Sequence, residues 1–112
     1  MRGAEMYKAI GIWSWPTDPD LDAFEQHYEK VHLPLAERLP GLRRLTALRA
    51  ADDARASGFF RVAEVYWDDR AGFERAAVSD EWQTMARDAG QLMERFGVTL
   101  TSANGDELEQ SF

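Results

Sequence analysis

Two histidines and a tyrosine are the side chains in this sequence best suited to proton transfer. His32 stands four residues after Tyr28, so the two share one face of a helix and point into the same space. A histidine titrates near neutral pH and can move a proton to or from a bound molecule. We expect His32 to act as a general acid/base and Tyr28 to assist it. The structural alternatives are a histidine that hydrogen-bonds kinked backbone and a core tyrosine with a satisfied hydroxyl.

The second histidine is expected to lie apart from the first. His27 precedes His32 by five residues, which on a regular α-helix separates the two side chains by about 140°. We therefore expect His27 on the surface and no metal site built from the two histidines. The chain has no cysteine, which excludes thiolate zinc sites and cysteine nucleophiles. It has no Gly-rich phosphate loop and no nucleophile elbow.

A second group of residues could bind a small substrate. Arg43 could bind a carboxylate, although a structural ion pair with Glu64 or an aspartate is an equally simple role. Glu64 is a candidate buried carboxylate, and we expect it to pair with an arginine of the preceding strand. The side chains that could line a pocket for an aromatic molecule are Trp13, Tyr66, Trp82 and Met85. Packing in the core or in a dimer is the alternative for all four.

The elements that carry these residues follow from hydrophobic periodicity. Alternation predicts strands over 5–15, 42–50 and 59–67, and a short final strand over 96–101. Gly11 suggests a bulge or a close approach within the first strand. A first helix begins near Asp18 and Pro19, and Pro34 should kink or break it near Leu33.

Two further helices are expected in the second half of the chain. Asp68 or Asp69 caps a short helix, and Ser79 caps a longer one. The apolar stripe of the longer helix comprises Trp82, Met85, Ala86, Ala89, Met93 and Phe96. Gly90 suggests close packing or a weak point in that helix.

This β-α-β-β-α-β order is the split motif of an α+β, ferredoxin-like fold with an antiparallel sheet. We expect one domain over 1–103 and a polar C-terminal tail over 104–112. Both faces of the first and third strands carry large apolar residues. Because the helices cover one sheet face only, we expect a homodimer that buries the other.

Composition narrows the functional classes. A chain of 112 residues fits a single domain, and its net charge of −7 argues against nucleic-acid binding. No apolar segment follows the first residues as in a signal peptide, and no run approaches the ~18 residues of a membrane span. We expect a cytoplasmic protein with no membrane partner.

Three segments resemble one known family. They are Phe24-x-x-x-Tyr28-x-x-x-His32-x-Pro34-Leu35, Leu39-Pro40-Gly41-Leu42-Arg43-Arg44 and Ala63-Glu64-Val65-Tyr66-Trp67-Asp68. Together with Ser79-Asp80-Glu81-Trp82 and the later Asp88, they are similar to the EthD family of dimeric α/β-barrel proteins, which is named for its association with ethyl tert-butyl ether degradation. The resemblance covers residues 5–102. Leu45 and Trp13-Ser14-Trp15-Pro16 depart from the family pattern, and both departures would reshape a pocket.

The resemblance implies a ferredoxin-like monomer that pairs its sheet with a second copy to form a barrel. It also implies acid/base chemistry without metal or flavin on a small aromatic, lactone or polyketide-like molecule, of the isomerase, dehydratase or decarboxylase type. A non-catalytic ligand-binding or accessory protein of a degradation pathway is one alternative. A heme-binding or monooxygenase-like barrel protein, with His32 as axial ligand, is another.

Overall fold

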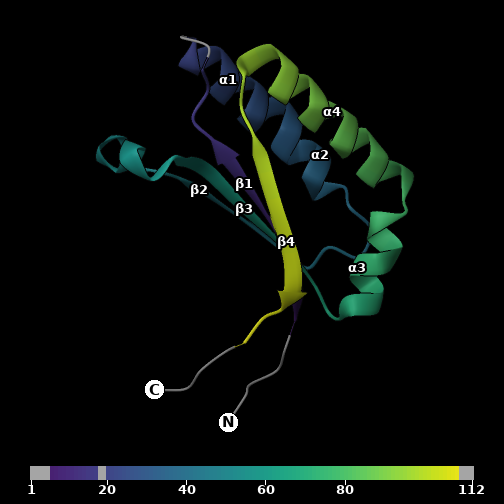
Figure 1. Ribbon diagram of the computed structural model, residues 1–112. Helices are drawn as coiled ribbons and strands as arrows, with labels where there is room; N and C mark the ends of the chain where they lie inside the picture. The colour runs from purple at the N-terminus through teal and green to yellow at the C-terminus, as the bar shows by residue number, and fades with distance from the viewer. Residues whose placement is uncertain (1–5, 18–19, 109–112) are drawn as a thin grey trace.

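Four antiparallel strands form one sheet, and the α-helices all lie on a single side of it (Figure 1). The computed structural model describes residues 6–17 and 20–108. The strands are β1 Tyr7–Ser14, β2 Arg44–Arg49, β3 Phe59–Trp67 and β4 Leu100–Asp106, in the spatial order β2-β3-β1-β4. The helices are α1 Leu21–His27, α2 Leu33–Glu37, α3 Arg70–Ala77 and α4 Asp80–Phe96. A π-helical turn, Tyr28–His32 (η1), joins α1 to α2, and a 3₁₀ turn, Asp52–Ser57 (η2), joins β2 to β3. This is the predicted α+β, ferredoxin-like arrangement.

Side-chain caps fix where the helices begin. Ser79 Oγ accepts a hydrogen bond from the Trp82 amide at 3.1 Å, and Asp69 Oδ1 accepts from the Gly72 amide at 2.8 Å, as the sequence predicts. Helix α1 begins at Leu21 with Asp20 as its N-cap. The expected cap Asp18 and the expected first helical residue Pro19 lie outside the described residues.

A β-bulge in β3 changes which side chains face the helices. Trp13 pairs with Arg61 while Ser14 pairs with Phe59, so Phe60 is the extra residue. Phe60 packs in the core, and the next residue, Arg61, also reaches the helices through Glu25. Strict alternation predicts that Phe60 and Arg61 lie on opposite faces of the sheet. This prediction is wrong at the bulge. Gly11 itself is regularly paired with Ala63 and forms no bulge.

The last strand begins and ends later than the range 96–101 that the sequence predicts, since β4 spans Leu100–Asp106. β4 extends to Asp106, so the boundary expected after residue 103 falls inside a strand. Asn104 pairs with Ala9, and the Tyr7 hydroxyl donates to Asn104 Oδ1 at 2.5 Å. An exposed edge strand needs no apolar alternation because its backbone bonds to one neighbour only, so its polar sequence resembles a tail.

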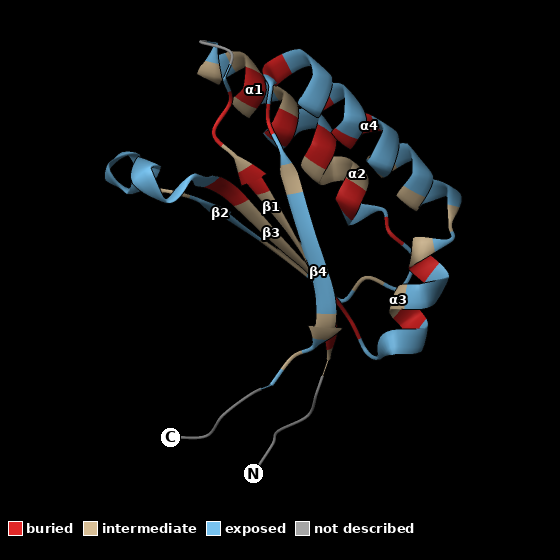
Figure 2. Ribbon diagram, viewed as in Figure 1, coloured by how far each residue is buried: buried red, intermediate tan, exposed pale blue. Residues whose placement is uncertain are grey.

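Two hydrophobic clusters hold the helices against the sheet, one near each end of the strands. The first consists of Trp13, Trp15, Phe24, Tyr28, Phe60, Ala89, Leu92, Phe96 and Val98. The second is built on Leu39, Trp67 and Ala76. The buried helix residues face the sheet, and the outer surface of α4 is mostly exposed (Figure 2). The core therefore has two centres, not one continuous layer.

The buried face of α4 differs from the predicted stripe. Met93 is 37% exposed and Ala86 is exposed, whereas Asp88, Ala89, Leu92 and Phe96 are buried. The helix is therefore rotated so that a carboxylate faces inward. This inward carboxylate is central to the site described below.

Within the described residues, no helix combines the length and the apolar composition that crossing a membrane requires.

Candidate functional site

A widened helical turn brings the two histidines to the same point. The Leu33 amide donates to the carbonyl of Tyr28, five residues earlier, which is the hydrogen bond of a π-helical turn. Pro34 has no amide hydrogen and crowds the preceding turn, so the helix accommodates it by widening this turn. The expected break near Leu33 does not occur, because α-helical geometry continues to Glu37. Residues five apart then lie one turn apart on the same side.

Asp88 of α4 binds both histidines. His32 Nδ1 lies 2.9 Å from Asp88 Oδ2, and His27 Nε2 lies 2.7 Å from Asp88 Oδ1. The prediction that His27 points away from His32 onto the surface is wrong, since it assumes a regular α-helix. The His32 and Asp88 side chains are 9% and 8% exposed, whereas that of His27 is 21% exposed. The three residues, which we call the His-Asp-His array, thus run from the surface to the interior.

Burial keeps the His32 ring uncharged. Desolvation lowers the pKa of His32 below its ordinary value, Asp88 opposes this shift, and a charge on His27 adds to it. The neutral form of His32 is therefore favoured over the charged form. A carboxylate only accepts hydrogen bonds, so the ring proton belongs on Nδ1, facing Asp88. The Nε2 lone pair then remains available as a base.

Aromatic side chains surround the His32 ring. Tyr28 stacks beside it with ring centroids 5.9 Å apart, and the ring of Trp13 meets it edge-on at 5.2 Å. The Tyr28 hydroxyl is buried and has no hydrogen-bond partner among the described residues. Burial raises the pKa of Tyr28 to about 12, although the nearby guanidinium of Arg61 acts in the opposite direction. Three predicted site residues, Trp13, Tyr28 and His32, are thus brought together.

A row of small residues crosses the helix-facing side of the sheet beside this group. In register, Ala47 pairs with Ala63, Ala63 with Gly11, and Gly11 with Ser102. Ala47 and Ser102 are exposed, and Gly11 and Ala63 are partly accessible, although all four face the helices. A Cβ placed on Gly11 would meet only Leu100 Cδ1, at 3.5 Å, and no helix atom within 4 Å. This row, the small-residue row, lies two residues along β1 from Trp13, and the exposure of Ala47 and Ser102 shows that the helices do not fully cover it.

Two predicted site residues lie elsewhere. Arg43 is 61% exposed at its side chain and contacts Asp68 at 3.4 Å, so it makes the surface ion pair that was its alternative role. Tyr66 lies on the opposite sheet face and donates to Glu64 Oε2 at 3.0 Å. Glu64 pairs with Lys8 of β1 and not with an arginine of β2, because Thr46 stands opposite it on that strand.

Trp82 and Met85 belong to the second core cluster. Both pack against Trp67, Leu39 and Ala76, and the Trp82 ring meets that of Phe73 edge-on at 5.8 Å. The structure therefore does not bring them to His32. Their position fits the packing role that the sequence also allowed.

Sequence reasoning named Asp88 only as part of the family resemblance, without a role in the site, and it missed the small-residue row. The signal for Asp88 was present, since a carboxylate interrupts the apolar positions Met85, Ala89 and Leu92. The row can be recognised only from the pairing register of all four strands, so no single segment of the sequence reveals it. The register brings together residues from four distant parts of the chain.

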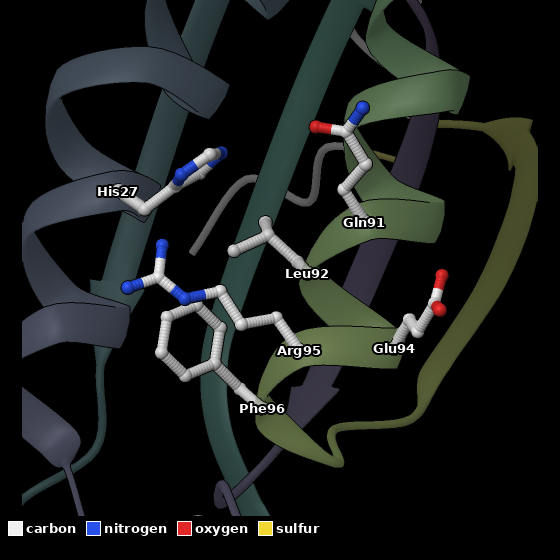
Figure 3. A pocket seen from close by; sticks show the side chains of 6 residues that line it. All are labelled: His27, Gln91, Leu92, Glu94, Arg95 and Phe96. Carbon is white, nitrogen blue, oxygen red and sulfur yellow. The ribbon is translucent and has the colours of Figure 1, made fainter.

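A surface pocket of about 480 Å³ opens beside His27. His27 points across from α1 toward α4, which contributes the other lining residues Gln91, Leu92, Glu94, Arg95 and Phe96 (Figure 3). In the part of the chain that the structure describes, no three His, Cys, Asp or Glu side chains are placed so that they could hold a metal ion.

Comparisons with known proteins identify the family. The EthD domain matches residues 17–95. A crystal structure of an ethyl tert-butyl ether degradation (EthD) family protein from Bacillus halodurans is 31% identical, with a TM-score of 0.70 over 88% of this chain and 96% of that chain. An uncharacterized 11.0 kDa protein of Rhodococcus erythropolis, from the thcB-thcC intergenic region, is 29% identical over 85% of this chain and 90% of its own length.

More distant structures share the fold. The cofactor-independent oxygenase SnoaB of Streptomyces nogalater is 20% identical, with a TM-score of 0.61 over 97% of each chain. A hydroxynitrile lyase from Passiflora edulis is 14% identical, with a TM-score of 0.62 over 98% of this chain and 99% of that chain. The domain match covers more than half of the sequence and agrees with the fold. The chain belongs to the EthD family.

Proposed function

We propose that this protein is a small-molecule enzyme that uses His32 as a general base, without a metal or a flavin. The observation that carries the proposal is the 2.9 Å contact between His32 Nδ1 and Asp88 Oδ2. A buried carboxylate that orients an imidazole while leaving its second nitrogen free is the arrangement that activates a histidine base. Tyr28 supplies a hydroxyl next to the ring that has no partner among the described residues.

The small-residue row provides the surface on which a flat substrate would lie. Gly11 and Ala63 offer no side chain beyond a methyl group, and Trp13 borders the row two residues further along β1. A planar aromatic, lactone or polyketide-like molecule fits an apolar surface of this kind. Its acidic C–H or O–H would face His32, which favours isomerisation, dehydration or decarboxylation. Arg43, Tyr66, Trp82 and Met85 have no part in this proposal.

Relatives support chemistry of this general class. Membership of the EthD family supports small-molecule catalysis or binding without a cofactor. Two proteins that share this fold are a cofactor-independent oxygenase and a hydroxynitrile lyase. The reaction proposed for this chain rests on its own His32, Tyr28 and Asp88.

Deuterium incorporation tests the proposal even though the natural substrate is not identified. A panel of small lactones and phenolic acids is incubated with the protein in D₂O, and proton loss at activated carbons is followed by NMR. The wild type should accelerate exchange, and His32→Gln should lose at least about 100-fold of it, the typical contribution of a general base. Equal exchange by wild type and His32→Gln would exclude His32 as the base. A Soret band after heme titration would favour the heme-binding alternative instead.

A paired substitution tests where the substrate lies. Gly11→Leu fills the small-residue row and should abolish ligand binding while the fold persists, because a Cβ at Gly11 would meet only Leu100 Cδ1, at an ordinary contact distance of 3.5 Å. Ile10→Leu, one residue earlier on the opposite sheet face, is the matched control. Binding that survives Gly11→Leu would place the substrate elsewhere.

We also propose that a second copy of the chain covers the helix-free face of the sheet. Ile10, Ile12, Val62 and Leu48 form the apolar part of this face, with Leu48 54% exposed. Lys8, Glu64 and Thr46 form a polar group toward one end of it. An apolar centre beside satisfied polar groups is typical of an interface between identical subunits. A dimeric ferredoxin-like protein from Jannaschia shares the fold with a TM-score of 0.58.

A further inference from the structure

We propose that His27 is a positioning residue, which holds Asp88 so that the ring proton of His32 stays on Nδ1. When His27 carries a second proton, its charge weakens His32 as a base. The inference deepens the function proposed above, on which it rests, and assigns a role to a residue outside the buried group. It follows from the geometry of the His-Asp-His array and from the pocket beside it.

Each oxygen of the Asp88 carboxylate contacts one of the two histidines. His27 Nε2 contacts Oδ1 at 2.7 Å and His32 Nδ1 contacts Oδ2 at 2.9 Å. With one oxygen held by His27, the carboxylate plane is fixed, and its second oxygen faces His32. A carboxylate free to rotate would hold the imidazole less firmly and would let its proton move to Nε2, the nitrogen that must act as base.

Charge couples the two histidines through Asp88. Both histidines share a single negative charge, so a proton taken by His27 makes a second proton on His32 less favourable. The physical cause is the same Coulomb repulsion by which His27 already lowers the pKa of His32. The other groups near His32 are the aromatic rings of Trp13 and Tyr28. Among the described residues, the charged groups that line the pocket beside His27 are Glu94 and Arg95 of α4.

His27 is the member of the array that solvent reaches most easily. The His27 side chain is more exposed than the other two members of the array and lines the pocket of about 480 Å³ (Figure 3). A pocket of that size admits a free imidazole molecule. Replacing His27 by a smaller residue should therefore leave a space at the outer end of the array that imidazole from solution can occupy.

The experiment follows the ring nitrogens of His32 by ¹⁵N NMR in the full-length protein. Wild type should show His32 protonated on Nδ1. His27→Ala should shift His32 toward the Nε2-protonated form, and added imidazole should restore the original signals. His27→Gln keeps an N–H donor near the position of Nε2 without a charge, so it should keep the Nδ1 form and raise the midpoint of His32 titration.

Gln91→Ala is the matched control, because Gln91 lines the same pocket but has no hydrogen bond to Asp88 among the described residues. It should leave the His32 signals unchanged. A His32 tautomer and titration that are the same in wild type, His27→Ala and His27→Gln would overturn the inference. Since these signals require no substrate, the inference can hold even if His32→Gln retains activity and the proposed function fails.

Discussion

His32 is the residue whose environment has the clearest thermodynamic consequence. Its pKa is lowered in the folded state because burial disfavours the charged ring. Below the ordinary histidine pKa, the unfolded chain therefore binds more protons than the folded protein does. The free energy of unfolding must then decrease as the pH falls. The contribution of His32 to stability is complete above the ordinary histidine pKa. It is lost as the pH falls through the lowered pKa that His32 has in the folded protein.

The prediction is that the free energy of unfolding, measured by urea titration, falls between pH 7.5 and pH 5 more steeply in the wild type than in His32→Gln. The difference between the two curves isolates His32 from the carboxylates, which both proteins share. Parallel curves would mean that His32 titrates in the folded protein as it does in the unfolded chain.

Tyr28 carries a hydroxyl that has no partner among the described residues. An unsatisfied buried polar group costs roughly 1–3 kcal/mol, so Tyr28→Phe should raise the free energy of unfolding by about 1 kcal/mol. The same substitution should reduce activity if the hydroxyl serves a substrate. Thermal unfolding compared with turnover checks both effects. A loss of stability would show that the hydroxyl has a partner after all.

At the level of single residues, helix periodicity predicted only part of the site. The four-residue spacing of Tyr28 and His32 placed both inward correctly, and Trp13 joined them. The same periodicity misplaced His27, because it assumes about 100° per residue and the π-helical turn advances less. Pro34 indicated an irregularity, but not whether the helix would break or widen.

Two glycines, one inside helix α4 and one directly after it, allow the stability of this helix to be tested. A Cβ on Gly90 would meet nothing within 4 Å. The close packing considered for Gly90 is therefore absent. Gly90→Ala should stabilise the protein by about 1 kcal/mol through helix propensity alone.

Gly97, seven residues later, should respond with the opposite sign. It ends the helix with φ +65°, and a Cβ there would overlap Thr17 Oγ1. Gly97→Ala should destabilise by at least about 1–2 kcal/mol, since the left-handed conformation alone has this cost. Chemical denaturation of both variants checks the pair. Equal effects would mean that α4 does not end at this glycine.

Among the elements, those with a complete local signal were predicted best. β3 was found with its observed bounds, and the caps Ser79 and Asp69 marked their helices. The last strand was predicted over 96–101, four to five residues before β4 begins and ends, because an edge strand of polar residues lacks an apolar pattern. The bulge at Phe60 could not be predicted, since it depends on the pairing of β3 with β1.

On the scale of the whole molecule, the unequal covering of the sheet decides how the chain should associate. The helices bury one face, while Ile10, Ile12 and Val62 remain partly exposed on the other. A charge placed among these side chains would be buried without a partner in a sheet-to-sheet dimer and would cost several kcal/mol per subunit. Because the two copies are related by symmetry, one substitution introduces two such charges.

Ile12→Glu should therefore convert the dimer to a monomer, as measured by sedimentation or light scattering at working concentration. Val78→Glu is the matched control, because Val78 is 78% exposed and follows α3 on the helix side, away from the sheet face. It should leave the dimer intact. A wild-type protein that is monomeric, or an Ile12→Glu variant that remains dimeric, would show that a second copy does not cover this face. Because the His-Asp-His array lies on the helix side of the sheet, the monomeric variant should keep the NMR signals of His32, which separates assembly from the chemistry of the site.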